Sequence, residues 1–165
     1  MKTVCRVLSA AILIIFILLY LPLTVPQLFG YDCSAVVSAS MEPAIKTGSL
    51  VYFSPADPRT LAEGDVIVFR SSYGADVSDV CHRIVTNDTE KQSIVTKGDA
   101  NSNNDFVPVS YDLVRGKVLK VIPFGGNIAL FLTSVGGKRS MAGLLLPAIL
   151  LHIAGSSAEK RPKRR

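Results

Sequence analysis

The sequence predicts a small, mainly β domain, an antiparallel sheet or partial barrel, flanked by two transmembrane helices. Three observations support this prediction. A long uncharged apolar stretch lies near the N-terminus of the 165-residue chain. Short strand-like runs separated by turn residues fill its middle, and a shorter apolar segment followed by a basic cluster lies near its C-terminus. A chain of this length has room for one modest domain.

The N-terminal stretch, residues 7–25, contains no charged residue. As a helix rising ~1.5 Å per residue it would span roughly 28 Å, close to the thickness of a bilayer core. Lys2 and Arg6 precede it, so the positive-inside rule places the N-terminus in the cytoplasm and the following chain outside. A cleaved signal shares these features, but prolines and bulky residues follow the core where a small-residue cleavage site is needed. We therefore predict that residues 1–26 form a cytoplasmic tip and a retained anchor.

The middle of the chain, residues 31–121, is predicted to be the β-rich domain. Its strand-like runs lie at residues 49–53, 65–69, 82–86, 93–96 and 113–121. Short runs with frequent breaks favour antiparallel pairing over alternating strands and helices. No stretch here keeps a helical period for three turns.

The C-terminal segment, residues 141–154, is apolar apart from one proline and one histidine. It is shorter than the ~17 residues that usually cross a bilayer. We predict a second transmembrane helix at residues 140–155, the alternative being a re-entrant or surface-lying helix. Residues 122–139 would then be a linker with an interfacial piece, and residues 156–165 a basic cytoplasmic tail.

Charge and cysteine content exclude several classes of protein. Five of the 18 basic residues lie in residues 160–165, and the remaining 13 match the 13 acidic residues, so a nucleic-acid-binding surface is not expected. Three cysteines do not form a disulfide framework. Cys33 and Cys81 either pair or serve as small buried hydrophobes. No cysteine or histidine spacing indicates zinc, and we expect neither a metal nor a cofactor.

A serine pair, Ser38 and Ser40, provides the candidate nucleophile. A serine hydroxyl is weakly nucleophilic and needs a base to take its proton. In an extended strand residues i and i+2 share a face, so the Ser38 hydroxyl could donate a hydrogen bond to an oxyanion formed at Ser40. Met41 is expected to be exposed, as an apolar lip toward membrane or substrate.

The candidate base and acid lie far along the chain. His82 is one of two histidines and falls in a strand-like run. Asp99 and Asp105 lie in a polar turn after the next run, and either carboxylate could orient the imidazole. Their spacing imitates the start of a calcium loop, but the glycine and the glutamate that such a loop needs are missing. The third member of the predicted serine–histidine–aspartate site therefore stays open.

Four ordered segments carry a resemblance to a known family. They are Ser-Met-Glu-Pro at 40–43, Gly-Asp-Val-Ile-Val-Phe at 64–69, His-Arg-Ile-Val at 82–85, and the run from Lys-Gly-Asp through the second aspartate at 97–105. Together they resemble type I signal peptidases. The match is to the endoplasmic-reticulum, archaeal and sporulation-type branch, in which a histidine replaces the lysine base of the usual bacterial branch.

The resemblance implies roles for individual residues. Ser40 matches the nucleophile, His82 the general base, Asp105 the third member and Asp99 a supporting aspartate. Ser38 matches a position that helps to bind the oxyanion in the lysine branch. Two alanines depart from the common pattern, at positions where glycine and asparagine are frequent, and we do not expect them to remove activity.

The resemblance also implies the function. The chain would be a membrane-bound serine endopeptidase that removes signal peptides from exported precursors by acyl-enzyme hydrolysis. Its partners would be those precursors and membrane lipid; the sequence identifies no accessory subunit. It would lie in the cell membrane or the endoplasmic reticulum membrane, with both termini cytoplasmic and the catalytic domain on the opposite side. The alternatives are a tethered serine peptidase that processes another precursor, a non-catalytic scaffold, and a polyanion-binding protein that acts through its basic tail.

Overall fold

The computed structural model describes residues 2–71 and 78–157. Two compact units make up the chain: residues 26–130 form one, and residues 1–25 together with 131–165 form the other. The basic tail predicted at residues 156–165 lies outside the described residues from position 158 onward.

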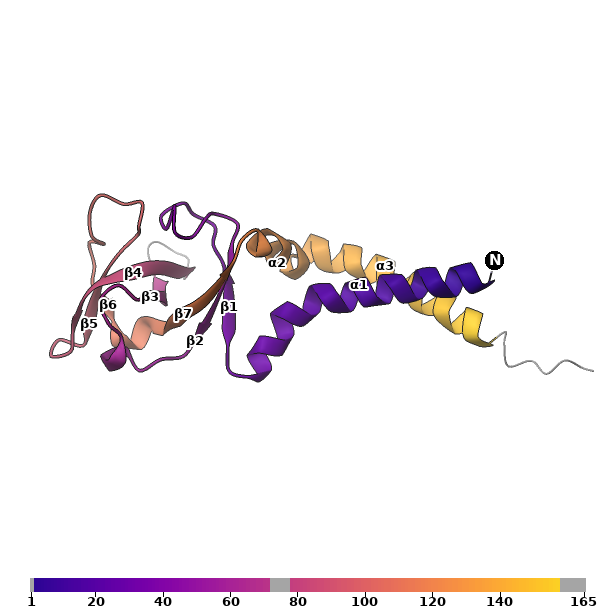
Figure 1. Cartoon of the computed structure of the whole chain (residues 1–165), viewed down its shortest axis with the longest axis horizontal. Helices are drawn as coiled ribbons and strands as arrows, with labels where there is room; N and C mark the ends of the chain where they lie inside the picture. The colour runs from indigo at the N-terminus through magenta and orange to yellow at the C-terminus, as the bar shows by residue number, and fades with distance from the viewer. Residues whose placement is uncertain (1, 72–77, 158–165) are drawn as a thin grey trace, which may run out of the picture. The chain divides into compact units, whose positions relative to one another are not determined.

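Residues 26–130 fold around a seven-stranded sheet (Figure 1). The strands are β1 (Asp32–Ala35), β2 (Leu50–Ser54), β3 (Val66–Ser71), β4 (Ser78–Asp88), β5 (Ser93–Lys97), β6 (Val109–Ser110) and β7 (Val114–Ile122). Their order is β1-β2-β7-β3-β4-β5-β6, and the neighbours pair antiparallel. The predicted mainly β, antiparallel fold is therefore confirmed. Two short 3₁₀ turns, η1 (Pro58–Thr60) and η2 (Tyr111–Leu113), connect strands.

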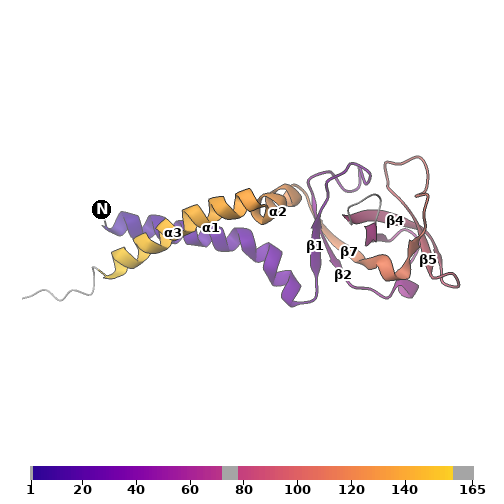
Figure 2. The same cartoon turned by 180° about the vertical axis from the view of Figure 1, so that it is seen from behind.

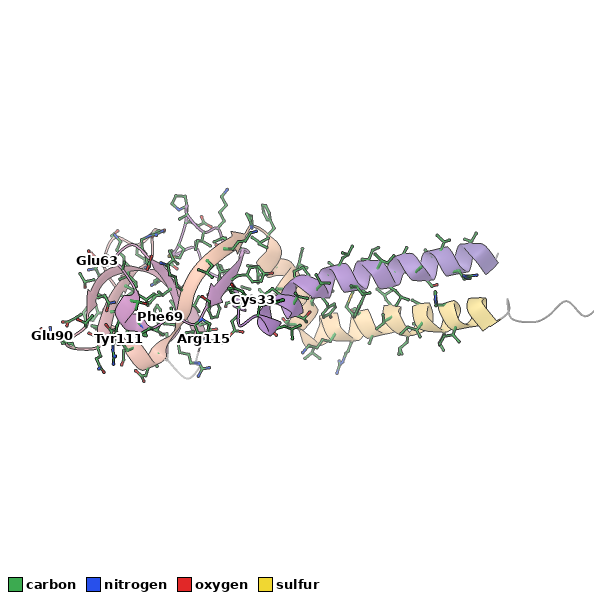
Figure 3. All side chains as sticks on the ribbon, turned by 60° about the horizontal axis from the view of Figure 1, so that its bottom comes forward. Cys33, Glu63, Phe69, Glu90, Tyr111 and Arg115 are labelled. Carbon is green, nitrogen blue, oxygen red and sulfur yellow. The ribbon has the colours of Figure 1, made fainter. Side chains whose placement is uncertain are left out.

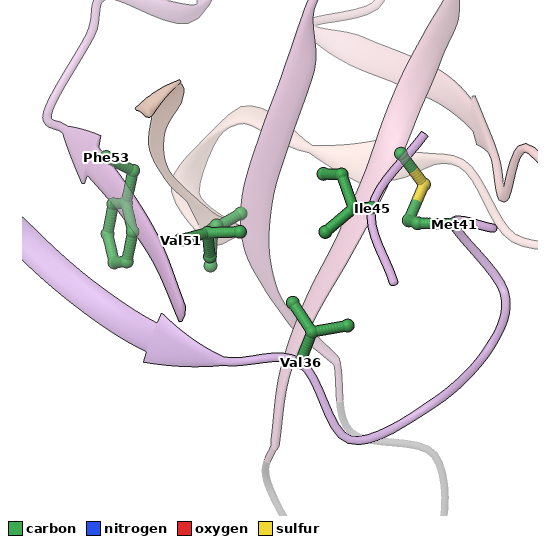
Figure 4. Packing of buried hydrophobic residues seen from close by; sticks show 6 residues of the cluster. Val36, Met41, Ile45, Val51 and Phe53 are labelled. Atoms are coloured by element: carbon green, nitrogen blue, oxygen red, sulfur yellow. The ribbon is translucent and has the colours of Figure 1, made fainter. Parts of the chain in front are cut away.

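The sheet carries an apolar cluster on each face. Alternate residues of a strand point to opposite faces, so in β3 Val68 enters one cluster while Ile67 and Phe69 enter the other. This explains why β3 is a continuous apolar run rather than an alternating one. The first cluster joins Val36, Met41, Ile45, Val51, Phe53 and Val68 (Figure 4). The second joins Leu61, Ile67, Phe69, Ile84, Ile94 and Val109.

The expectation that Met41 is exposed is wrong. Its side chain is 0% exposed and belongs to the first cluster. The reason is local: the chain here is a turn and not a strand. The Glu42 amide donates to the Ala39 carbonyl at 3.0 Å, and the Ile45 amide donates to the Met41 carbonyl at 2.9 Å. The turn directs Met41 and Ile45 inward, and their burial anchors the segment that carries Ser40.

The other unit contains α1 (Lys2–Leu28) up to Val25 and α3 (Val135–Ser157), and these two helices lie side by side (Figures 1 and 2). α2 (Gly125–Thr133) precedes α3 in the chain. Among the described residues, one helix is long and apolar enough to cross a membrane, Arg6–Leu28, with a mean hydropathy of 2.6. The side chains of this helix, drawn as sticks in Figure 3, consist almost entirely of carbon.

α3 begins six residues before Met141, where the predicted apolar segment started. Two glycines, a lysine, an arginine and a serine fill residues 136–140. They lower the hydropathy of this stretch but do not prevent a helix, so the apolar pattern alone placed the start too late. α3 contacts α1 through His152, whose Nδ1 lies 3.3 Å from the Ser9 hydroxyl.

Candidate active site

Ser40 lies in the turn anchored by Met41, and a second loop packs against it. The Ala100 amide donates to the Ser40 carbonyl at 2.8 Å. A Cβ at Gly98 would lie 2.6 Å from the same carbonyl oxygen, so only glycine allows this approach. The loop after β5 therefore fixes the backbone of Ser40. No sequence pattern assigns this role to Gly98 and Ala100, because it depends on two loops meeting in space.

The structure brings Ser40, His82 and Asp105 into one hydrogen-bonded chain. The His82 Nε2 lies 3.1 Å from the Ser40 Oγ, and the His82 Nδ1 lies 2.6 Å from the Asp105 Oδ2. His82 is 8% exposed, pairs with Ile67 across β3 and β4, and has the Phe69 ring edge-on at a centroid distance of 6.2 Å. A hydroxyl, an imidazole and a carboxylate in this order can pass a proton away from the hydroxyl.

Asp99 lies elsewhere in the site, against Arg83. The Arg83 Nε and Nη2 donate to the two carboxylate oxygens of Asp99 at 2.8 and 2.7 Å, and the Arg83 Nη1 donates to the Gly64 carbonyl at 2.7 Å. The hydrogen bonds to Asp99 raise the pKa of Arg83. Of the two candidate aspartates, Asp105 contacts His82, and Asp99 ties its own loop to β4. Sequence reasoning assigned no role to Arg83, although a cation one residue after His82 was a visible signal.

The Ser38 hydroxyl lies 3.1 Å from that of Ser40. The two hydroxyls are adjacent, as the i, i+2 spacing suggested, but a bend and not an extended strand brings them together. Ser38 is exposed and Ser40 is half-buried.

Comparison with known proteins identifies the family. No family model matches the chain. The catalytic subunit of the signal peptidase complex of Candida albicans is 31% identical over 122 residues, which are 67% of this chain and 71% of that subunit. The corresponding subunit of Scheffersomyces stipitis is 30% identical over 128 residues, 70% of this chain and 75% of that subunit. The chain belongs to the signal peptidase family.

Signal peptidase I W of Bacillus subtilis is also similar, at 41% identity over 97 residues. These are 56% of this chain and 48% of the Bacillus protein, so the chain spans about half the length of that relative. The relatives are thus a signal peptidase I and catalytic subunits of signal peptidase complexes. The signal peptidase family predicted from the sequence is therefore confirmed.

In this member of the signal peptidase family a cavity of about 400 Å³ opens beside Ser40. β1 and β4 supply half of its lining residues, among them the small or apolar Ala35, Val80 and Cys81. Arg115 of β7 (labelled in Figure 3) ties these two strands together, because it donates to Asp32 of β1 at 2.9 Å and to Asp79 of β4 at 2.6 Å. Arg115 therefore links the two strands that contribute to the lining.

Cys81 borders both this cavity and His82, which makes it the obvious rival nucleophile. Burial, and then the nearby Asp99 carboxylate, raise the pKa of the Cys81 thiol to about 12, although the Arg83 charge opposes the shift. A thiol of this kind stays protonated at neutral pH and is a poor nucleophile. Cys33 and Cys81 are both free, so the disulfide that the sequence left open is not formed.

Proposed function

We propose that this chain is a membrane-bound serine endopeptidase that removes signal peptides from exported precursors through an acyl-enzyme. The hydrogen-bonded chain from Ser40 through His82 to Asp105, in a member of this family, is the observation that carries the proposal. For His82 Nε2 to take the hydroxyl proton, Nδ1 must carry a proton, and the carboxylate at 2.6 Å stabilises that tautomer.

The mechanism follows from these contacts. The Ser40 Oγ attacks the scissile carbonyl while His82 Nε2 takes its proton, and the imidazolium then returns a proton to the leaving amine. Water, activated by the same imidazole, cleaves the ester and restores Ser40. The Ser38 hydroxyl, 3.1 Å from the attacking oxygen, would donate to the oxyanion together with the Ser40 amide. One such donor lowers the barrier by roughly 3 kcal/mol.

Asp99 supports the site without touching the reacting atoms. Its bidentate pair with Arg83 anchors the loop whose Ala100 amide binds the Ser40 carbonyl. The cavity beside Ser40 would receive the acyl side of the precursor, and its limited volume favours small side chains near the cut bond. The buried Met41 takes no direct part in substrate binding.

The proposed setting is a bilayer with both termini on the cytoplasmic side. α1 would anchor residues 1–26, α3 would supply the second span, and the domain at residues 31–121 would face the exported precursor. The contact of the Ser9 hydroxyl with His152 supports the pairing of α1 with α3, and the Tyr20 hydroxyl of α1 also donates to the carbonyl of Leu132, in α2, at 3.3 Å. Polar contacts between helices within lipid have no water to compete with them.

The helix pairing predicts a specific cross-link. In a chain whose native cysteines are replaced by alanine, Ser9→Cys combined with His152→Cys should form an intramolecular disulfide on mild oxidation in membranes. The matched control, Ser9→Cys with Leu150→Cys, should not, because the Leu150 side chain is 67% exposed. Gel mobility before and after reduction measures the cross-link. Equal cross-linking of both pairs would contradict the proposed packing.

A cleavage assay tests the proposed activity and its substrate class. The full chain in lipid vesicles should cut a secretory precursor at one bond, releasing a mature protein whose new N-terminus follows small residues. The same precursor with large charged residues before that bond should stay intact, because they do not fit the cavity. Cleavage of regulatory precursors but of no secretory one would favour the tethered-peptidase alternative, and no cleavage of either would favour the scaffold.

A further inference from the structure

Thr96 is a polar side chain with no exposure to solvent, at the end of β5. Its Oγ1 donates to the Asp105 Oδ2 at 2.6 Å. The same carboxylate oxygen lies 2.6 Å from the His82 Nδ1. The Asp105 amide also donates to the Thr96 carbonyl at 2.8 Å. One residue therefore holds both the backbone and the carboxylate of Asp105.

The sheet explains why Thr96 can do this. Thr96 pairs with Ile84 across β4 and β5, and His82 lies two residues before Ile84 in β4, on the same face. Thr96 and His82 thus reach the same carboxylate from adjacent strands. The loop between Thr96 and Asp105 folds back so that Asp105 meets both, while Asp99 within that loop is held by Arg83.

We propose that Thr96 is a positioning residue that fixes the Asp105 carboxylate against His82, an inference that rests on the proposed function. A carboxylate with a single partner can rotate about its own side-chain bonds, and the imidazole it orients then loses its alignment with the Ser40 hydroxyl. The threonine hydroxyl restricts that rotation.

Substitutions at Thr96 in the full chain test the proposal. Thr96→Val keeps the shape and removes the donor, and it should lower kcat roughly tenfold to a hundredfold with little change in KM. Thr96→Ser keeps the hydroxyl donor, and its kcat should stay within about threefold of that of the parent chain. The control for lost stability is Ile94→Val, because Ile94 is 0% exposed in the same strand and is not hydrogen-bonded to Asp105.

The split between kcat and KM separates positioning from a general structural effect. Thr96 is buried and does not line the cavity beside Ser40, so KM and thermal unfolding of Thr96→Val should stay close to those of Ile94→Val while its kcat is lower. A Thr96→Val enzyme with the kcat of Ile94→Val would overturn the proposal.

Imidazole NMR provides a readout that needs no turnover. The whole chain has two histidines, so the spectrum of a His152→Gln variant assigns the His82 signals. Thr96→Val, or Thr96→Ala if the valine variant does not fold, should change the chemical shifts of the His82 ring at neutral pH, because the carboxylate that contacts Nδ1 is no longer held, and Thr96→Ser should not. Unchanged His82 signals in Thr96→Val and in Thr96→Ala would overturn the inference. If Ser40→Ala remained active, the proposed function itself would fail, which is a separate result.

Discussion

Replacing Ser40 with alanine should abolish precursor cleavage while leaving the domain folded. The hydroxyl removed is the one that His82 Nε2 contacts at 3.1 Å, and no other described nucleophile lies as well placed against that nitrogen. Loss of the serine from a site of this type reduces kcat by roughly 10⁴-fold to 10⁶-fold. The side chain is half-buried and outside both apolar clusters, so thermal unfolding should change little. Rates of mature-protein release, with unfolding followed by circular dichroism, measure both effects.

Ser38→Ala is the matched control for this experiment. It removes a hydroxyl 3.1 Å away that is not bonded to the imidazole, so the expected loss is about 10²-fold to 10³-fold, as for one oxyanion donor. The Ser40→Ala chain should still bind the precursor and compete with the active enzyme. If Ser40→Ala cleaved as fast as the parent chain, both the nucleophile and the serine mechanism would be wrong. A scaffold would tolerate both substitutions equally.

The strands were predictable because their signals are local. β2, β3, β4, β5 and β7 contain apolar or β-branched runs bounded by turn residues, and all five coincide with predicted runs within a few residues. β1 and β6 were missed for a physical reason. β1 has four residues and no β-branched side chain, and β6 is two residues long. Such short strands form because the edge of an adjacent strand is free to pair with them, and the sequence carries no local signal of that pairing.

The residues of the site were predictable, but their hydrogen-bond partners were not. Ser40, His82 and the two aspartates were named from residue chemistry and from the resemblance. Whether Asp99 or Asp105 meets the imidazole depends on how the loop after β5 folds back on that strand. Arg83, the partner that binds Asp99 instead, belongs to another strand. The prediction that Met41 is exposed was wrong for a similar reason, because a turn and not a strand sets the direction of its side chain.

Substitution of Asp105 should mainly lower kcat, whereas substitution of Asp99 should mainly lower stability, and this comparison decides their roles. Asp105→Asn keeps the side-chain shape but exchanges the carboxylate beside His82 Nδ1 for an amide, so kcat should fall by roughly 10³-fold to 10⁴-fold. Unfolding should change less, because the amide oxygen can still accept from Thr96. Precursor turnover and thermal unfolding of the two variants, measured side by side, make the comparison.

Asp99→Asn should instead act mainly on stability. It leaves Arg83 without its carboxylate in a partly buried pair whose aspartate side chain is 17% exposed, at an expected cost of about 1–3 kcal/mol in unfolding free energy. Its loss of kcat should be smaller than that of Asp105→Asn and should arise through the loop that holds the Ser40 carbonyl. The combined variant Arg83→Gln with Asp99→Asn should recover part of the lost stability, since it leaves no unpaired charge. A large loss of kcat in Asp99→Asn with normal unfolding, beside a mild Asp105→Asn, would reverse the assignment and make Asp99 the acid partner of His82.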